Sequence, residues 1–288
     1  MKTNQLLEKI IHIFFFLVGM ITVGCVLLIS VYLVISGLPA MGEIGLLPFL
    51  FGKTWASTSS PAQYGILPFI LTSIYGTFGA ILLGVPIGFF TALYLSKIAS
   101  GKTKAVMQSA ISLLAGIPSV VYGLVGMLVL VPGIRRLFDL PDGSSLFAAI
   151  IILAIMILPS IITLSITALD AVPKEYEDAS LALGATPMET YLRVSVPAAK
   201  SGIAASVVLG VGRAIGEAMA VMMVSGNVPN MPDSLFQSVR FLTTAVSSEM
   251  AYSSGLQQQA LFSIALVLFL FIMMINAALN FFLKRQKD

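Results

Sequence analysis

The sequence predicts an all-α polytopic membrane protein with six transmembrane helices. Of its 288 residues, 58% are hydrophobic and 10% are charged, and the mean hydropathy is +0.99. A soluble domain carries about a quarter charged residues. Predominantly apolar stretches, each of at least the roughly 20 residues that cross a hydrocarbon core, occur at 10–35, 65–95, 105–131, 144–169, 201–225 and 259–283.

The first predicted span starts close to the N-terminus. Its apolar run is longer than the core of a signal peptide and lacks a clear small-x-small cleavage site, so we expect it to remain as an anchor. The external loop that follows contains Trp55, a residue type typical of the membrane interface. The expected segments are the first helix and external loop, 1–64, a five-helix core, 65–283, with an internal loop at 170–200, and a cytoplasmic tail, 284–288.

The distribution of Lys and Arg predicts the orientation. With a cytoplasmic N-terminus, six crossings return the C-terminus to the same side. The internal segments then contain eleven basic residues: Lys2, Lys9, Lys97, Lys102, Lys104, Lys174, Arg193, Lys200, Lys284, Arg285 and Lys287. The external loops contain only Lys53, Arg135, Arg136 and Arg240. Because cytoplasmic loops are enriched in Lys and Arg, both termini are expected to be cytoplasmic. The longest external segment, 226–258, is the expected docking place of a soluble partner.

Small residues and proline mark the second and third spans. Gly84 and Gly88 lie four residues apart, which predicts a helix packing face. In the third span, Gly116, Pro118 and Ser119 interrupt the helical pattern. A break at membrane depth is tolerated only where it is buried in protein or lines a water-filled cavity. The sequence leaves open whether this break is a packing kink or part of a substrate path.

Two charged residues, Arg213 and Glu217, lie within the fifth span. A charge at the bilayer centre costs several kcal/mol, so such residues usually face a protein interior or an aqueous path. In a continuous helix their four-residue spacing puts both on one face, together with Ser206 and Gly210. We therefore expect this face to line a cavity. The alternative is a buried ion pair that only fixes helix packing.

The internal segment 170–200 has the pattern of two short helices. Pro173 suits a first turn, the acidic residues after it favour the positive end of a helix dipole, and Gly184 suits a helix end. Thr186-Pro187-Met188-Glu189 then predicts a capping box that starts a second helix. A helix, glycine turn and helix against the inner membrane face are suited to transmit force from a cytoplasmic partner, although a structural loop would look similar.

The sequence contains no recognisable catalytic or metal site. Cys25 and His12 are the only cysteine and histidine, which leaves no Cys/His metal cluster. The triplets at 52–54 and 101–103 read Gly-Lys-Thr but lack the earlier glycine of a phosphate-binding loop. We expect a transport subunit and not an enzyme, with no metal or cofactor of its own, surrounded by a lipid bilayer and without a nucleic-acid partner.

The internal loop resembles a known motif. Asp178-Ala179-Ser180, Gly184 and Val194-Ser195-Val196-Pro197 are similar to the EAA motif in membrane subunits of bacterial ABC importers, with Asp for Glu, Ser for the second Ala and Val for Ile and Leu. In that family the segment is a coupling helix that docks in a groove of a separate ATPase. The resemblance implies an ATPase-coupling role for Glu177, Asp178, Ala179, Gly184, Ala185 and Pro187.

Two further stretches resemble the phosphate-specific branch of these importers, most closely its C-type permease. They are Leu-Ala-Gly-Ile-Pro-Ser-Val-Val-Tyr-Gly at 114–123, and Gly-Arg-Ala-Ile-Gly-Glu at 212–217 running on to Gly226-Asn227. The resemblance implies a type I importer permease in a bacterial or archaeal cytoplasmic membrane. Its partners would be a second, A-type permease, an ATPase homodimer that binds ATP and Mg, and an external phosphate-binding protein.

The resemblance also implies a substrate path through Arg213 and Glu217, to which we add Ser119. The fixed donors of Arg213 match phosphate oxygens, and Glu217 is predicted to accept a hydrogen bond from a protonated phosphate oxygen, which sulfate cannot supply. Other readings remain open: a permease for sulfate or molybdate, an ATP-independent secondary anion carrier, and a membrane scaffold for phosphate sensing. Secondary carriers usually show inverted repeats, and the sequence has no clear repeat.

Overall fold

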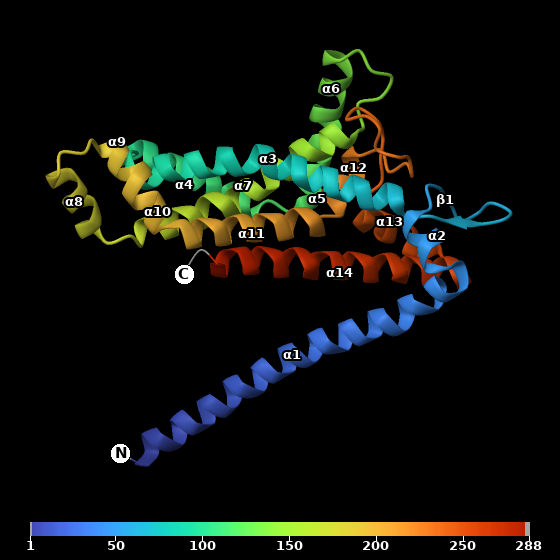
Figure 1. Ribbon diagram of the computed structural model, residues 1–288, viewed down its shortest axis with the longest axis horizontal. Coiled ribbons are helices and arrows are strands. Elements are labelled where there is room, and N and C mark those ends of the chain that lie inside the picture. The colour runs from blue at the N-terminus through green and yellow to red at the C-terminus, as the bar shows by residue number, and fades with distance from the viewer. Residues whose placement is uncertain (1, 286–288) are drawn as a thin grey trace.

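The computed structural model describes residues 2–285, apart from the side chains of 2–7, 279–280 and 282–285; residues 286–288 of the expected tail lie outside this part. Almost all of it is helical (Figure 1). The long helices are α1 (Lys2–Ile44), α3 (Leu67–Lys97), α7 (Leu146–Asp170) and α14 (Gly255–Arg285). Among the described residues five helices are long and apolar enough to cross a membrane, and a bent pair, Pro187–Ala198 with Lys200–Gly216, supplies a sixth at an angle of 70°.

Two of the expected spans are not continuous helices. The stretch 105–131 is divided into α4 (Gly101–Gly116), α5 (Ser119–Val125), the π-helical turn η1 (Gly126–Leu130) and α6 (Val131–Leu137). The stretch 201–225 is divided into α11 (Lys200–Gly216) and α12 (Met219–Val224). The break in the first of these was expected at Gly116 to Ser119 and is confirmed. The expectation of one helix through Ser225 is wrong.

Helix α7 is the centre of the core. Its residues from Leu146 to Ile161 form half of the largest buried cluster, which also includes side chains of α12 and the segment that follows it. Helix α3 packs closely on α7, because a Cβ at Gly84 would lie 2.7 Å from Ile157, and one at Gly88 would lie 2.8 Å from Ile161. The small residues of α3 therefore form the predicted packing face.

Helix α1 diverges from the bundle (Figure 1). Only its C-terminal part contacts α14, where Tyr32 and Phe262 meet edge to face and Ser263 donates a hydrogen bond to the carbonyl of Gly37. A Cβ at Gly19 or Gly24 would meet nothing within 4 Å. With 43 residues, α1 is about 65 Å long, and most of it presents apolar side chains to its surroundings.

The end of the bundle opposite the chain termini is covered by short elements. They are α2 (Leu46–Phe51), the antiparallel strands β1 (Trp55–Ala56) and β2 (Gln63–Tyr64), α13 (Leu242–Glu249) and η3 (Met250–Tyr252). Glu249 holds this cover together, since it forms an ion pair with Arg240 and accepts hydrogen bonds from Trp55 at 3.2 Å and Gln257 at 3.0 Å.

The internal segment forms α8 (Lys174–Ala182), α9 (Pro187–Thr190), the π-helical turn η2 (Tyr191–Ser195) and α10 (Val196–Ala198). These elements lie at the same end of the molecule as the N-terminus of α1 and the C-terminus of α14 (Figure 1). The helix, glycine turn and helix predicted from the sequence are confirmed.

Candidate functional site

The first helix break separates α4 from α5. Ile117 and Pro118 have extended backbone, with ψ angles of 127° and 145°, and Ser119 is the first residue of α5. The break frees carbonyl groups that a continuous helix would use. The Tyr122 hydroxyl donates a hydrogen bond of 2.7 Å to one of them, the carbonyl of Leu114. Ser119 thus lies half-buried at the break, and its place in a substrate path stays a prediction.

The second break separates α11 from α12. Glu217 has extended backbone, with φ −73° and ψ 129°. Its carboxylate accepts a hydrogen bond of 3.0 Å from the Ala220 N–H in the first turn of α12, and its carbonyl accepts one of 2.8 Å from the Thr243 hydroxyl. The expected shared face of Arg213 and Glu217 is therefore wrong, because that geometry requires a helix that continues past Gly216.

The two broken segments pack against each other beside α7. A Cβ on Gly123 of α5 would lie 2.8 Å from the Cα of Ala220 in α12, so only a glycine allows this approach. A Cβ on Gly126 would lie 2.7 Å from Val224 and 2.9 Å from Ile152 of α7. Tyr122, one residue before Gly123, and Ala214, one residue after Arg213, belong to the same buried cluster. The tertiary structure thus brings the two sequence motifs, 114–123 and 212–217, to one place.

Arg213 lies in the last turn of α11, where a cation interacts favourably with the helix dipole. It is thirteen residues, or about 20 Å, beyond the start of the helix at Lys200. Its Nη1 lies 3.5 Å from the Ser160 hydroxyl, to which it donates a long hydrogen bond. Among the described side chains Lys97 pairs with Glu177 and Arg240 pairs with Glu249, and Arg213 takes part in neither ion pair. Nothing in this geometry supports the alternative of an Arg213–Glu217 pair.

Arg213 lines an open cavity of 560 Å³ between α11, α7 and α14. The rest of the lining is Ser160, Ala205, Val208, Leu209, Gly212 and Asn276. The cavity is thus mostly apolar, with one charged and two neutral polar side chains.

Two residues expected in this lining lie elsewhere. Ser206 is buried and shares a hydrogen bond of 2.9 Å with Ser165 of α7, while Gly210 is packed against Ile161. They form the face of α11 that contacts α7. The face of α11 that lines the cavity is offset from Ser206 and Gly210 by about one residue position.

Sequence reasoning missed Ser160 and Asn276. Ser160 follows Pro159 in a buried part of α7, and Asn276 interrupts an apolar run in α14. The signal for Asn276 is its type, because an amide is costly to bury without hydrogen-bond partners. The sequence alone does not say which helices approach Arg213.

The coupling segment is built as a rigid projection. Gly184 has a φ of +88°, a conformation that favours glycine, and it ends α8 as predicted. Thr186 and Glu189 form both hydrogen bonds of the predicted capping box, with Pro187 at the first helical position. The backbone and hydroxyl hydrogen bonds from Thr186 lower the pKa of Glu189. Asp178, Ala179 and Ala185 of this projection differ in exposure, the first two being exposed and Ala185 half-buried.

Glu177 connects the coupling segment to the bundle. Its carboxylate lies 2.6 Å from Nζ of Lys97, the last residue of α3, and accepts a hydrogen bond of 2.8 Å from Ser195 in η2. Burial raises the pKa of Glu177, but the hydrogen bonds from Lys97 and Ser195 outweigh this effect, and the pKa is lowered overall. Some apolar side chains of the segment are exposed beside its charged residues, with Leu183 91% exposed and Tyr176 56% exposed.

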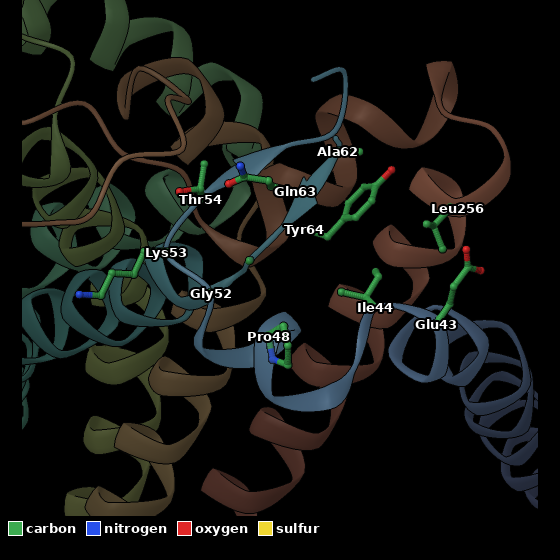
Figure 2. A pocket seen from close by; sticks show the side chains of 11 residues that line it. Glu43, Ile44, Pro48, Gly52, Lys53, Thr54, Ala62, Gln63, Tyr64 and Leu256 are labelled. Atoms are coloured by element: carbon green, nitrogen blue, oxygen red, sulfur yellow. The ribbon is translucent and has the colours of Figure 1, made fainter. Parts of the chain in front are cut away.

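A second cavity, of 570 Å³, lies at the opposite end of the molecule, under the β1–β2 hairpin. Glu43 and Lys53 lie on opposite sides of it, with Gln63 and Tyr64 between them (Figure 2). None of its lining residues belongs to the lining of the Arg213 cavity.

Comparison with known proteins identifies the family. A family model described as "Binding-protein-dependent transport system inner membrane component" matches residues 84–288. The chain is 40% identical over 266 residues to the probable ABC transporter permease protein YqgH of Bacillus subtilis (strain 168), covering 90% of this chain and 86% of the relative. It is 34% identical over 243 residues to the phosphate transport system permease protein PstC of Pasteurella multocida (strain Pm70), covering 77% and 76%.

Solved structures share the fold. A chain of the inward-facing MetNI methionine ABC transporter matches with a TM-score of 0.62 at 19% identity, covering 77% of this chain and 95% of that chain. A chain of a bacterial alginate ABC transporter, solved with a pentasaccharide-bound periplasmic protein, matches with a TM-score of 0.62 at 16% identity, covering 95% and 94%. The protein therefore belongs to the family of binding-protein-dependent transport system inner membrane components.

Proposed function

We propose that this chain is a permease subunit of an ATP-driven importer that moves inorganic phosphate across the cytoplasmic membrane of a bacterium or archaeon. The observation that carries the proposal is Arg213, which lies at membrane depth, lines an open cavity and pairs with no carboxylate of the described residues. Relatives at 34% identity are phosphate transport permeases. A guanidinium that keeps its charge in a partly desolvated cavity is suited to an oxyanion.

In this proposal the site binds phosphate weakly. The cavity offers one cation and two neutral polar groups in a mostly apolar lining, which is enough to accept an anion without trapping it. Release requires such weak binding, so strong affinity belongs to an external phosphate-binding protein. Glu217 then acts through the backbone, since its carboxylate holds the first turn of α12 beside the path.

The energy in this proposal comes from a separate ATPase homodimer that holds ATP and Mg. Its docking surface is the coupling segment, whose exposed Leu183, Tyr176 and Met188 provide apolar contacts next to the acidic Asp178. The start of α1 and the end of α14 lie at the same end of the molecule as this segment (Figure 1), so docking of the ATPase there makes both of these helix ends cytoplasmic. The excess of Lys and Arg expected at this end supports the same orientation.

A second, A-type permease completes the path in this proposal. Helix α4 buries no residue, and α1 leaves most of its apolar surface uncovered. Lipid covers part of such surface, and the paired permease covers the part that faces the Arg213 cavity. ATP-driven transport requires both permeases, the ATPase and the binding protein.

Uptake of radioactive phosphate into vesicles tests the proposal. The complete complex should accumulate phosphate only with ATP and the binding protein, and this chain alone should not. Arg213→Gln should lower the initial uptake rate by about tenfold or more, because a hydrogen-bonded charge opposite the anion is lost. The matched control is Arg136→Gln, at an exposed arginine of α6.

Each contrary result has a distinct meaning. Equal uptake by wild type, Arg213→Gln and Glu217→Gln complexes would remove both residues from the path. Transport of sulfate or molybdate in place of phosphate would mean that the substrate is one of those anions, which a guanidinium binds as well. Transport by this chain alone would make it a secondary carrier, a class in which broken helices are also common.

A further inference from the structure

Asn276 is the one side-chain amide in the lining of the Arg213 cavity. It belongs to α14, while Arg213 belongs to α11 and the third polar group, Ser160, belongs to α7. We propose that Asn276 contacts the transported anion beside Arg213 and favours an oxyanion that carries a proton. This inference rests on the proposed function and adds a substrate-contacting residue to it.

The position of Asn276 makes a purely structural role costly. It follows the run Leu-Phe-Leu-Phe-Ile-Met-Met-Ile in a membrane-spanning helix, nine residues or about 14 Å before Arg285. Within the described residues its amide takes part in no hydrogen bond, although it is half-buried. An amide at this depth without a partner loses several kcal/mol relative to water. A structural amide would be satisfied by a neighbouring helix, as Ser206 is by Ser165.

The three polar groups lie at similar depths. Ser160 is ten residues, or about 15 Å, before the end of α7 at Asp170. Arg213 is about 20 Å from the start of α11 and carries a long flexible side chain. Its donation to Ser160 is 3.5 Å long, so the guanidinium keeps donors free for another acceptor. The cavity is thus a place where one anion meets groups from three helices.

The chemistry of the amide suits a protonated oxyanion. Asn presents two N–H donors and one carbonyl acceptor. The donors can bind the charged oxygens of phosphate, and the acceptor can take the proton of a P–OH group. Sulfate carries no such proton at neutral pH. A sulfate oxygen placed beside the amide oxygen of Asn276 would form no hydrogen bond, because both atoms are acceptors. The sequence had assigned this acceptor role to Glu217, but that carboxylate is engaged by the Ala220 N–H.

Phosphate uptake per ATP hydrolysed tests the contact. In vesicles that hold the complete complex, Asn276→Leu, which removes both donors and the acceptor but keeps the branched shape of the side chain, should lower uptake by about tenfold. Hydrolysis stimulated by the binding protein should stay within about twofold of wild type, because the coupling segment is untouched. Asn276→Gln should recover a large part of the uptake. The control is Met273→Leu, at a position of α14 that is 56% exposed and outside the cavity lining.

Two results would overturn the contact. One is wild-type uptake by Asn276→Leu. The other is a parallel loss of uptake and hydrolysis in both Asn276→Leu and Asn276→Gln, which would indicate a packing role. If the wild-type complex itself carries no phosphate, the proposed function fails instead. The uptake measured with the wild-type complex therefore distinguishes failure of the proposed function from failure of the Asn276 contact.

Phosphorus NMR tests the preference for a protonated anion. The complex in detergent, without binding protein, should broaden the line of millimolar inorganic phosphate, and equimolar sulfate should reverse this broadening more fully for Asn276→Leu than for wild type. Equal displacement by sulfate in both would show that Asn276 does not distinguish the anions. Absence of broadening with wild type would overturn the anion contact as well.

Discussion

Nζ of Lys97 lies 2.6 Å from a carboxylate oxygen of Glu177, and this ion pair joins the last turn of α3 to the coupling segment. The two residues are 80 positions apart in the sequence. Both side chains are largely buried, at 11% and 18% exposure, and Ser195 of η2 donates to the same carboxylate oxygen. A displacement of α8 by a docked partner is therefore passed to α3 and to the segment that leads into α11.

Removing this ion pair should weaken coupling. We expect Glu177→Gln to lower phosphate uptake per ATP hydrolysed by about tenfold, in line with the loss of one charge-assisted hydrogen bond. The double exchange Lys97→Glu with Glu177→Lys should recover part of it. The control is Glu175→Gln, at an exposed acidic residue of the same helix. Unchanged coupling in Glu177→Gln would show that α8 moves independently of α3.

The same contact should respond to acid. The pKa of Glu177 is lowered in the folded protein from an ordinary value of about 4.3, so its contribution to stability is fully present above that value. The contribution is lost as the pH falls through the lower, folded pKa. A spin label at position 183, on the exposed tip, should become more mobile below about pH 4.3. In Glu177→Gln the label should be mobile at pH 7 already, and an identical acid response in both proteins would contradict the assignment.

Gly123 should be the most sensitive glycine of the two breaks. A Cβ there would lie 2.8 Å from the backbone of Ala220 and from the sulfur of Met223, so Gly123→Ala must separate α5 from α12. We expect a loss of about 1–3 kcal/mol in stability, measured as a lower melting temperature in detergent, together with reduced uptake. Gly133→Ala, where a Cβ meets nothing within 4 Å, should be neutral. Equal melting temperatures for the two variants would show that the helices are not in contact.

The hydroxyl of Tyr122 should stabilise the first break. It donates to the Leu114 carbonyl at 2.7 Å, and this carbonyl also accepts a longer hydrogen bond of 3.3 Å from the Ile117 N–H. Tyr122→Phe removes the shorter of the two bonds, and the expected cost is about 0.5–1.5 kcal/mol, again measured by thermal unfolding in detergent. Tyr252→Phe, at a side chain that is 92% exposed, is the control. A stability equal to wild type would mean that water replaces the hydroxyl at the break.

Features that depend on neighbours in the sequence were predictable. Span positions follow from the length of apolar runs, since about 20 residues cross a bilayer core, and five of the six are recognisable in the long helices and α11. The break before Ser119 follows from Pro118, which lacks a backbone donor. The turn at Gly184 and the capping box from Thr186 to Glu189 follow from conformational freedom and short-range hydrogen bonds.

The site itself required contacts between distant residues. The spacing of Arg213 and Glu217 describes one face only if the helix continues, and whether it continues is decided by Thr243 and the packing of α12 on α5. Ser206 and Gly210 were expected in the cavity but contact α7, because rotation of α11 about its axis is set by its neighbours.

The sequence by itself therefore determined that this chain crosses a membrane, where two of its motifs occur and that a charged residue lies within a span. These properties come from transfer free energies and local backbone preferences, which act over a few turns of helix. Only the tertiary structure decided that Arg213 contacts Ser160 and shares a cavity with Asn276, and that Glu217 caps a helix. The first outcome depends on packing between segments more than 50 residues apart. The second depends on where α11 ends, which Thr243, 26 residues further along the chain, helps to fix through its hydrogen bond to the Glu217 carbonyl.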